Sequence, residues 1–453
     1  MRLRTLFCVV GLAWITATLP LMAQFVQQGP KLLDTNVVSP PIEQDFQGHS
    51  VSVSADGNTA LEGSLVNAFN TGFKTRGRVF TRSGGVWSQQ AIIGGPGSSS
   101  PAQGQPISAA LSGDGDTAIL GGPFVQGSNN TGAGQISTRS GAVWTSQGNS
   151  LVGTGAVGNA QQGTAVSISF DGNTAIIGGP MDNGGIGAAW IFTRSGTTWT
   201  QQGGKLVGSG FVGASLQGSS VAISADGNTA IIGGPGDNVN TGAAWVFTRS
   251  GGVWTQQGGK LVGTGAIGNA AQGQGVALSS DGNTAIAGGP GDSANAGAAW
   301  VFTRNAGTWT QQGPKILGAG AAGSALQGSS VSLSYDGNTA IIGGPGDNLN
   351  AGATWAFTRF GGVWVQFGNK LAAAGAQAGD RIGSSVSLSG DGLTAAIGAP
   401  GTLTCCAGSA NFINGAFYVF VREGVEIPAT TTSGLLFLAV VLAVCGVIAI
   451  RRL

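Results

Sequence analysis

One short segment of the sequence has residue types that are found in ion-binding loops. Residues 224–238 read SADGNTAIIGGPGDN, which combines an Asp-Gly pair with a Gly-Gly-Pro-Gly cluster. Carboxylate oxygens are the ligands that Ca²⁺ prefers, and glycine-rich loops can cradle phosphate. The segment therefore raises two chemical possibilities, a cation site and an anion site.

The residues around the motif support neither possibility. The turn supplies one carboxylate, Asp226, and only the turn at Asp114-Gly115-Asp116 adds a second acid, whereas Ca²⁺ takes about 6–8 oxygen ligands. The glycine cluster is not followed by the Lys-Ser/Thr pair of a phosphate-binding loop. We expect no metal and no other cofactor, and interpret the Asp-Gly pairs as turns in which glycine accepts a positive φ.

Catalytic arrangements are equally sparse. A Ser-His-Asp or Cys-His site would need the single histidine, His49, which takes a position held by Ser219 and Ser329 in other copies of the repeat. The sequence contains no His-Glu-x-x-His and no Gly-x-Ser-x-Gly motif. We expect no enzymatic activity. A secreted hydrolase, for example a carbohydrate-active enzyme with a pair of acids, stays open as an alternative.

Charge excludes one class of partner. The chain of 453 residues has 20 basic and 19 acidic side chains, for a net charge of +1. Such a balance offers no basic field for nucleic acid. We therefore expect no nucleic-acid partner.

The Asp-Gly turn recurs at nearly constant spacing, and this regularity predicts the architecture. A period of 55 to 58 residues suits the four-stranded blade of a β-propeller. In the fourth unit, strands are expected over 219–224, 229–234, 242–249 and 253–263. The predicted fold class is all-β, a seven-bladed β-propeller of four-stranded antiparallel blades over residues 24–426. Its units are centred on Asp56, Asp114, Asp171, Asp226, Asp281, Asp336 and Asp391.

The ends of this region predict how the ring closes. The seventh unit runs through GAFYVFVREG (415–424) and lacks a fourth strand, whereas QFVQQGPKLL from Gln24 aligns with the fourth-strand sequence VWTQQGGKLV. We expect the N-terminal strand to complete the last blade, because a closed ring hides sheet edges. The residues expected at this closure are Phe25, Gln27, Gln28, Leu32 and Tyr418.

Tryptophan recurs on the third and fourth strands of the repeat, for example at Trp245 and Trp254. Indole rings bury a large apolar surface, so we expect them to pack between blades. An exposed aromatic ladder that stacks sugars is the alternative.

The two ends of the chain differ from the repeats. Residues 1–23 have a basic start, an apolar run and Ala23 at a plausible cleavage point, which is typical of a secretory signal. The uncharged run 434–450 is followed by two arginines, and we expect it to form a transmembrane helix. Between the ends, only the adjacent Cys405 and Cys406 remain, and we interpret them as free thiols because a vicinal disulfide is strained.

The repeat GSSVAISADGNTAIIGGPGDN resembles the bacterial branch of the FG-GAP repeats, relatives of the integrin α-chain propeller, and residues 381–401 are similar to the same consensus. The resemblance covers residues 25–424 and implies a seven-bladed propeller on an exported protein that acts in adhesion, ligand binding or surface display. The calcium loop D-x-D-x-D-G-x-x-D of integrin-like blades is absent. Residues 427–453 are similar to IPTL-type sorting signals through Ile427-Pro428, which implies an exosortase-like processing enzyme, with a permanent membrane anchor as the competing interpretation.

The binding surface is expected where the repeat breaks. Units one and seven enlarge the loop between their second and third strands, over 67–76 and 401–414, and these units become neighbours when the ring closes. Loops on a rigid scaffold commonly carry function; drift near the closing seam would explain the same irregularity. The candidate surface residues are Phe69, Phe73, Lys74, Arg76, Arg78, Gln135, Cys405, Cys406 and Asn411.

These observations predict an exported protein at the cell envelope, displayed on the outer surface or released. We expect it to bind an extracellular or envelope protein or a glycan without catalysis. A structural envelope protein that associates with itself is the remaining alternative.

Overall fold

The unit of the fold is a four-stranded antiparallel blade, and the fourth repeat shows why the sequence builds it. The blade consists of β14 (Ser220–Ile223), β15 (Thr229–Gly234), β16 (Ala243–Ser250) and β17 (Val253–Gln256). The Asp226-Gly227 turn joins the first two strands, and Gly227 has the positive φ of 68° that this turn requires. Residues 257–263, expected to extend the fourth strand, lie outside it, although Leu261 makes an isolated bridge to Ala244.

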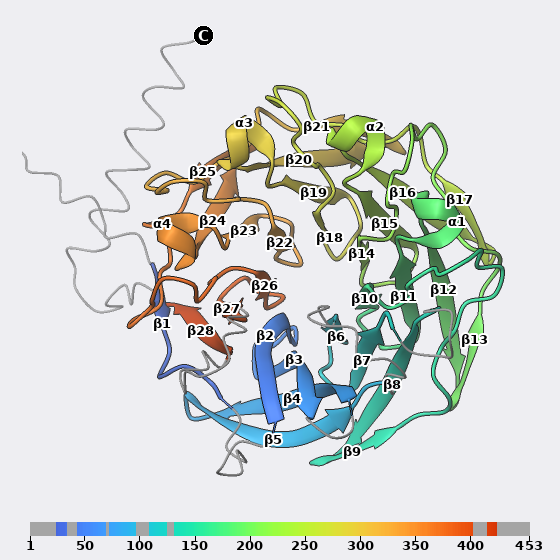
Figure 1. Ribbon diagram of the computed structural model, residues 1–453, viewed down its shortest axis with the longest axis horizontal. Coiled ribbons are helices and arrows are strands. Elements are labelled where there is room, and N and C mark those ends of the chain that lie inside the picture. Colours follow the sequence, from blue (N-terminus) through green and yellow to red (C-terminus); the bar gives the residue numbers. More distant parts are fainter. Residues whose placement is uncertain are drawn as a thin grey trace, which may run out of the picture. The chain divides into compact units, whose positions relative to one another are not determined.

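The computed structural model describes residues 24–33, 43–68, 72–96, 108–124, 131–401 and 415–423 (Figure 1). Within these ranges the side chains of 43–46, 65–68 and 72–75 are not described. Residues 25–422 form one compact unit.

The strands group into seven antiparallel sheets of four. Blade 1 contains β2 (Glu43–Val53), β3 (Thr59–Ala68), β4 (Gly72–Ser83) and β5 (Val86–Gly94). Blade 2 contains β6 (Ala109–Leu111), β7 (Thr117–Gly122), β8 (Ala133–Ser140) and β9 (Val143–Ser146). Blade 3 contains β10 (Ala165–Ile168), β11 (Thr174–Gly179), β12 (Ala188–Ser195) and β13 (Thr198–Gln201).

Blade 4 was given above. Blade 5 contains β18 (Gly275–Leu278), β19 (Thr284–Gly289), β20 (Ala298–Asn305) and β21 (Thr308–Gln311). Blade 6 contains β22 (Ser330–Leu333), β23 (Thr339–Gly344), β24 (Ala353–Phe360) and β25 (Val363–Gln366). Blade 7 contains β26 (Ser385–Leu388), β27 (Thr394–Ala399), β28 (Ala416–Arg422) and β1 (Phe25–Gln27). Short helical turns follow the second strand of blades 3 to 6: α1 (Asp182–Gly185), α2 (Asp237–Asn240), α3 (Asp292–Asn295) and α4 (Asp347–Asn350).

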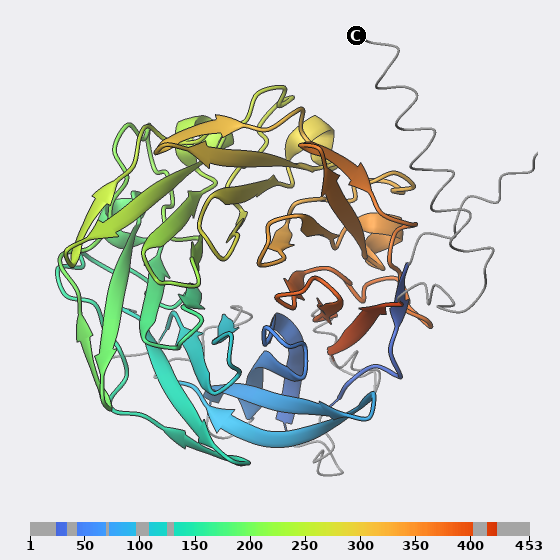
Figure 2. The same cartoon turned by 180° about the vertical axis from the view of Figure 1, so that it is seen from behind.

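The first strand of each blade lines the axis of the ring, and each contacts the first strands of the two neighbouring blades (Figures 1 and 2). The Asp-Gly turns join first and second strands, whereas α1–α4 join second and third strands, so the two sets lie at opposite ends of the blades. We call the first end the turn face and the second end the α face. Propeller architecture with four-stranded blades is therefore confirmed.

A cycle of backbone hydrogen bonds runs around the axis on the turn face. The residue before each Asp-Gly pair, or in blade 2 the aspartate itself, donates its N–H to a carbonyl of the next blade. The last donor, Gly390 of blade 7, bonds to the Ala55 carbonyl of blade 1 and so closes the cycle. The seven N···O distances are Ala55–Gly113 2.9 Å, Asp114–Phe170 3.4 Å, Phe170–Ala225 3.0 Å, Ala225–Ser280 3.0 Å, Ser280–Tyr335 2.9 Å, Tyr335–Gly390 2.9 Å and Gly390–Ala55 2.9 Å.

The seventh blade obtains its outer strand from the other end of the chain. β1 pairs antiparallel with β28, with Phe25 opposite Arg422 and Gln27 opposite Phe420. Leu32 forms a further antiparallel bridge to Phe417. Leu32 thus still contacts the seventh blade, and this pairing joins the two ends of residues 25–422.

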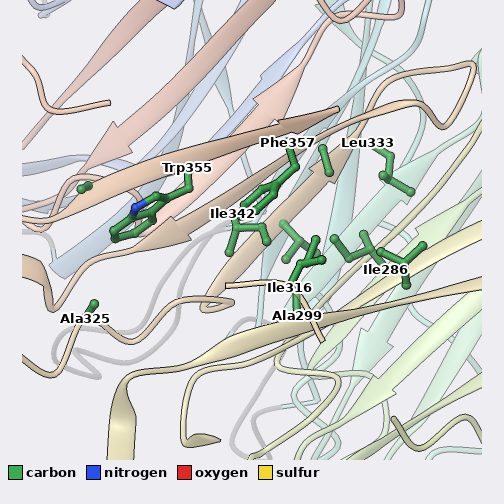
Figure 3. Packing of buried hydrophobic residues seen from close by; sticks show 12 residues of the cluster. Ile286, Ala299, Ile316, Ala325, Leu333, Ile342, Trp355 and Phe357 are labelled. Atoms are coloured by element: carbon green, nitrogen blue, oxygen red, sulfur yellow. The ribbon is translucent and has the colours of Figure 1, made fainter. Parts of the chain in front are cut away.

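The core lies between blades. In one cluster, Trp355 and Phe357 of blade 6 pack with Ile286 and Ala299 of blade 5 (Figure 3). The strand-three tryptophans Trp190, Trp245, Trp300 and Trp355 are fully buried. These indoles therefore pack between blades and do not form an exposed sugar-stacking ladder.

One part of the expected fold class requires correction. No helix among the described residues is long and apolar enough to cross a membrane. The α-helical elements that the structure does describe, α1–α4, have four residues each. The expected transmembrane helix is thus not among them; residues 434–450, the secretory signal 1–23 and the sorting signal 427–453 lie outside the described residues.

Candidate functional site

The Asp-Gly turns use their carboxylates to hold the turn itself. Asp226 accepts hydrogen bonds from the Ser224 hydroxyl at 2.6 Å and from the backbone and side-chain nitrogens of Asn228, each at 2.9 Å. Partial burial alone would raise the pKa of Asp226, but these hydrogen bonds and the charge of Arg249 outweigh it, so the pKa lies below its usual value. No cluster of three or more potential metal ligands occurs in the described part of the chain.

Beside the turns of blades 1 to 6, an arginine, a tryptophan and a glutamine connect neighbouring blades. Arg249 lies 5.4 Å from the ring centroid of Trp254. Gln202, which belongs to the preceding blade, accepts hydrogen bonds from Trp254 Nε1 at 2.9 Å and Arg249 at 3.1 Å. The stacking and the shared acceptor join adjacent sheets on the turn face. The other arginine–tryptophan pairs are Arg82–Trp87, Arg139–Trp144, Arg194–Trp199, Arg304–Trp309 and Arg359–Trp364.

The closing blade has an apolar version of this group. Phe25 takes the place of the tryptophan, and Phe367 takes the place of the glutamine. The two rings meet edge to face with centroids 6.5 Å apart, and Arg422 lies 4.1 Å from the Phe367 centroid. A phenylalanine has no N–H to donate, so the acceptor is no longer required and an apolar ring fills its place.

Two aromatic rings meet across the axis on the turn face. Phe170 of blade 3 and Tyr335 of blade 6 form an edge-to-face pair with centroids 5.9 Å apart. In the other five blades the equivalent position holds alanine, glycine or serine. A Cβ atom added to Gly113 would lie 2.2 Å from Phe170 Cδ2, and one added to Gly390 would lie 2.9 Å from Tyr335 Cδ2. The rings therefore depend on glycine in the neighbouring blades.

On the α face, four aspartates are buried rather than solvated. The Asp237 side chain is 1% exposed; it forms an ion pair with Lys260 at 2.5 Å and accepts the Val212 N–H at 2.7 Å. Acids in loops after a Gly-Gly-Pro cluster are expected to be solvated, but here each carboxylate ties a helical turn to the preceding interblade connection. The other pairs are Asp182–Lys205, Asp292–Lys315 and Asp347–Lys370.

The turns that these acids anchor are left-handed. In α2, Asn238, Val239 and Asn240 have φ of 48°, 57° and 64°. A branched residue in this region is uncommon and costs about 1–2 kcal/mol. The same conformation recurs at Ser293–Asn295 and Asn348–Asn350, so the strain is a repeated feature of the fold.

The tips of these turns expose aliphatic side chains on the α face. Val239 is 76% exposed and Leu349 is 81% exposed. Each turn lies against the interblade connection before it, where Val212 and Ile267 are also exposed; for example, Asn238 donates its N–H to the Val212 carbonyl at 3.0 Å. Exposed apolar side chains of the turns and of the interblade connections thus lie on the same face.

The residues expected to form a binding surface have different outcomes. Phe69, Cys405, Cys406 and Asn411 lie outside the described residues. Phe73 and Lys74 lie in β4, paired with Asn67 and Val66 of β3, and their side chains are not described. Arg76 is partly exposed. Gln135 is partly buried; its side chain accepts the Ser150 hydroxyl at 2.9 Å and donates to the Ile136 carbonyl at 3.1 Å.

Arg78 does not belong to any surface. It is fully buried, forms an ion pair with Glu62 at 3.1 Å and donates to the Ser64 hydroxyl at 2.5 Å. Glu62 in turn accepts the Gly48 N–H at 2.6 Å. The arginine occupies the position of a buried tryptophan in blades 3 to 6, and a buried charge requires such partners.

His49 lies near the closing seam and is partly buried. Burial, together with the nearby charge of Arg381, lowers its pKa to about 4, so the imidazole is neutral at pH 7. Among the described residues, no hydrogen bond places a serine or cysteine against it.

Three features of the α face and the axis escaped the sequence reasoning: the buried Asp–Lys pairs, the left-handed turns and the Phe170–Tyr335 contact. The recurrence of Lys 23 residues after each Asp in blades 3 to 6 is a signal that could have identified the first.

Residues 364–420 match the FG-GAP repeat family. This stretch carries one FG-GAP repeat. It spans the outer strand of blade 6 and most of blade 7, and the match supports the resemblance drawn from the repeat sequence. No curated protein matches the chain.

Solved structures with a similar fold are distant in sequence. U3-55K is 9% identical, with a TM-score of 0.48 over 85% of this chain and 99% of that one. The periplasmic gluconolactonase PpgL of Pseudomonas aeruginosa is 14% identical, with a TM-score of 0.46 over 78% and 96%. Hydrazine synthase of Kuenenia stuttgartiensis is 12% identical, with a TM-score of 0.46 over 81% and 95%. Identities this low say nothing of ligand or activity.

Proposed function

We propose that the chain is a non-catalytic binding or adhesion module that contacts a partner through its α face. The observation that carries this proposal is the exposure of Val239 and Leu349 at the tips of strained left-handed turns. An exposed aliphatic side chain contributes no burial energy that would offset its backbone strain. Presentation to a partner accounts for both the strain and the exposure.

The turns of the α face are also held rigidly in place, which favours this face as the binding surface. Each tip is fixed by a buried aspartate that bonds to both a lysine and a neighbouring connection, as Asp347 does with Lys370 at 2.6 Å and with the Ala322 N–H at 2.6 Å. Contacts that are held in place before binding lose less conformational entropy on association. The α face therefore offers a preorganised apolar surface with repeated geometry.

In blades 1 and 7 the second strand ends on the α face, at Ala68 and Ala399, so the connections that follow belong to the same proposal. The expected loop over 67–76 is shorter than predicted, because β3 runs to Ala68 and β4 begins at Gly72. Residues 69–71 and 402–414 lie outside the described residues. The partner class is an extracellular or envelope protein or a glycan. Export directed by residues 1–23, and processing of residues 427–453 by an exosortase-like enzyme, would bring the module to the cell envelope.

The test compares variants that the fold already tolerates. Blade 5 holds Ala294 at the position of Val239 and Leu349, with φ of 56°, so a Val239→Ala, Leu349→Ala double variant retains an allowed turn. Val253→Thr on the turn face is the matched control, because Thr198 and Thr308 occupy its position in blades 3 and 5.

Binding of the native protein, the double variant and the Val253→Thr control to a panel of purified matrix proteins and glycans is then measured. Loss of binding in the double variant alone supports the α face. Equal binding by all three proteins would remove this face from consideration. Self-association without any soluble ligand would favour the structural envelope alternative.

A further inference from the structure

A groove of about 590 Å³ runs along the outside of the ring where blades 2 and 3 meet. One wall is the connection 147–154 that follows β9, and the other is the β12–β13 hairpin. Its volume lies within the range of about 300–1,000 Å³ that small-ligand sites occupy. We propose that this blade 2–3 groove binds a neutral oligosaccharide.

The floor of the groove provides a fixed aromatic surface. Trp199 lines the groove beside Phe192. Gln147 accepts the indole N–H at 2.8 Å, and Arg194 lies 5.5 Å from the ring centroid. A ring held from two sides loses little freedom when a ligand packs on it, and the apolar C–H face of a sugar ring suits such a surface.

The rim provides neutral hydrogen-bonding groups. Asn149, Thr197 and Thr198 line the groove and are exposed. An amide and a hydroxyl can each donate and accept, as the hydroxyl groups of a sugar do. No residue of the lining carries a charge, which disfavours phosphates, acidic sugars and other ionic ligands.

The next junction of the same ring shows that the fold does not need these groups. Gly204, Gly252 and Val253 stand between blades 3 and 4 at the positions that Asn149, Thr197 and Thr198 take between blades 2 and 3. The strands β13 and β17 are nevertheless equivalent. Thr198 and Asn149 have counterparts elsewhere in Thr308 and Asn369, but the junction of blades 2 and 3 combines all three groups, a combination that blade assembly does not require.

A fourth difference is that the junction of blades 2 and 3 lacks the lysine found at the next junction. Ser150 stands where the next blade has Lys205. Lys205 reaches the α-face acid Asp182, whereas the Ser150 hydroxyl bonds to Gln135 at 2.9 Å. Loss of the long charged side chain leaves this wall short and neutral. Gln135 occupies the position that tryptophan holds in blades 3 to 6, and its hydrogen bond to Ser150 couples this exchange to the groove.

The experiment uses the full chain with neutral hexasaccharides as probes: maltohexaose, cellohexaose, chitohexaose and mannohexaose, with titration calorimetry as the readout. The test variant carries Asn149→Gly, Thr197→Gly and Thr198→Val, which reproduces the blade 3–4 junction and so keeps the fold. Thr308→Val, which gives blade 5 the residue of blade 4, is the control. We expect at least one probe to bind, with affinity reduced tenfold or more in the triple variant and unchanged in the control.

Two results would overturn the proposal: no hexasaccharide binds, or the triple variant binds as tightly as the native protein. Binding of an extended peptide at β13 in place of every sugar would also overturn it, by assigning the groove to strand addition. The α-face double variant Val239→Ala, Leu349→Ala should bind the sugar normally, so failure of either proposal is distinguishable from failure of the other.

Discussion

Gln28, which lies in the N-terminal segment, accepts the indole N–H of Trp87 in blade 1 at 2.9 Å. The same oxygen accepts Arg82 at 3.3 Å. On the other side of the closing blade, Gln27 accepts the N–H of Ala374 at 2.8 Å, and Phe25 packs on Phe367. Three neighbouring residues thus connect blade 7 to blade 1 and to blade 6.

Gln28→Ala should destabilise the ring by about 1–2 kcal/mol, because Trp87 and Arg82 lose a shared acceptor. Gln202→Ala, which removes the equivalent acceptor between blades 3 and 4, should cost a similar amount. Chemical denaturation of both variants measures the comparison. If Gln28→Ala left the free energy of unfolding unchanged while Gln202→Ala lowered it, the hydrogen bonds of Gln28 would not stabilise the ring closure.

Removal of residues 24–33 should lower the thermal unfolding midpoint much more than either substitution, because blade 7 then loses its outer strand and the Leu32 bridge. Adding a peptide of residues 24–33 should restore part of the midpoint. An unchanged midpoint in the truncated protein would contradict the closure.

Arg78→Ala should destabilise the protein by about 3–5 kcal/mol, since Glu62 stays buried without its cation. Replacing the buried group by the residues of blade 4, Arg78→Trp with Glu62→Ile and Ser64→Gly, should recover most of this loss, because Trp245 pairs with Ile232 and packs closely on Gly234 in blade 4. Equilibrium unfolding of the single and triple variants checks the difference. Equal losses in both would rule out the ion pair as the cause.

The pH dependence of stability should carry the signature of His49. Its folded pKa of about 4 lies below the unfolded value of 6.5, so the unfolded chain binds more protons between these values. The contribution of neutral His49 is fully present above pH 6.5 and is lost as the pH falls toward 4. The loss amounts to at most about 3 kcal/mol. His49→Ser, which matches Ser219 and Ser329, should flatten the unfolding free energy across this window, and parallel curves would contradict the assignment.

Gly113→Ala should destabilise the ring by about 1–3 kcal/mol, because its Cβ would overlap Phe170. Adding Phe170→Ala should remove part of that penalty, because the added Cβ would still lie 2.6 Å from the Tyr335 hydroxyl oxygen. A double-mutant cycle measured by denaturation separates the clash from other effects of each change. Additive losses would show that the two residues do not interact.

The fold could be predicted from the sequence because each repeat contains the turn and strand signals of a complete blade. Asp226-Gly227 marks a turn, the flanking runs alternate, and Phe25 matches the missing Trp254-type residue of the last blade. The site was less accessible. Asp237 looks like a loop acid until Lys260 is placed against it. Phe170 and Tyr335 are 165 residues apart, and only the closed ring brings them together.

The register of the closing strand determines how the ring would respond to tension. Phe25 and Arg422 face each other at one end of the β1–β28 pair, and these are the two ends of the propeller. A pull applied through both would open that ladder from its end, bond by bond, instead of loading all its bonds in parallel. A tethered molecule under flow would therefore yield first at blade 7, while the other six blades stay intact.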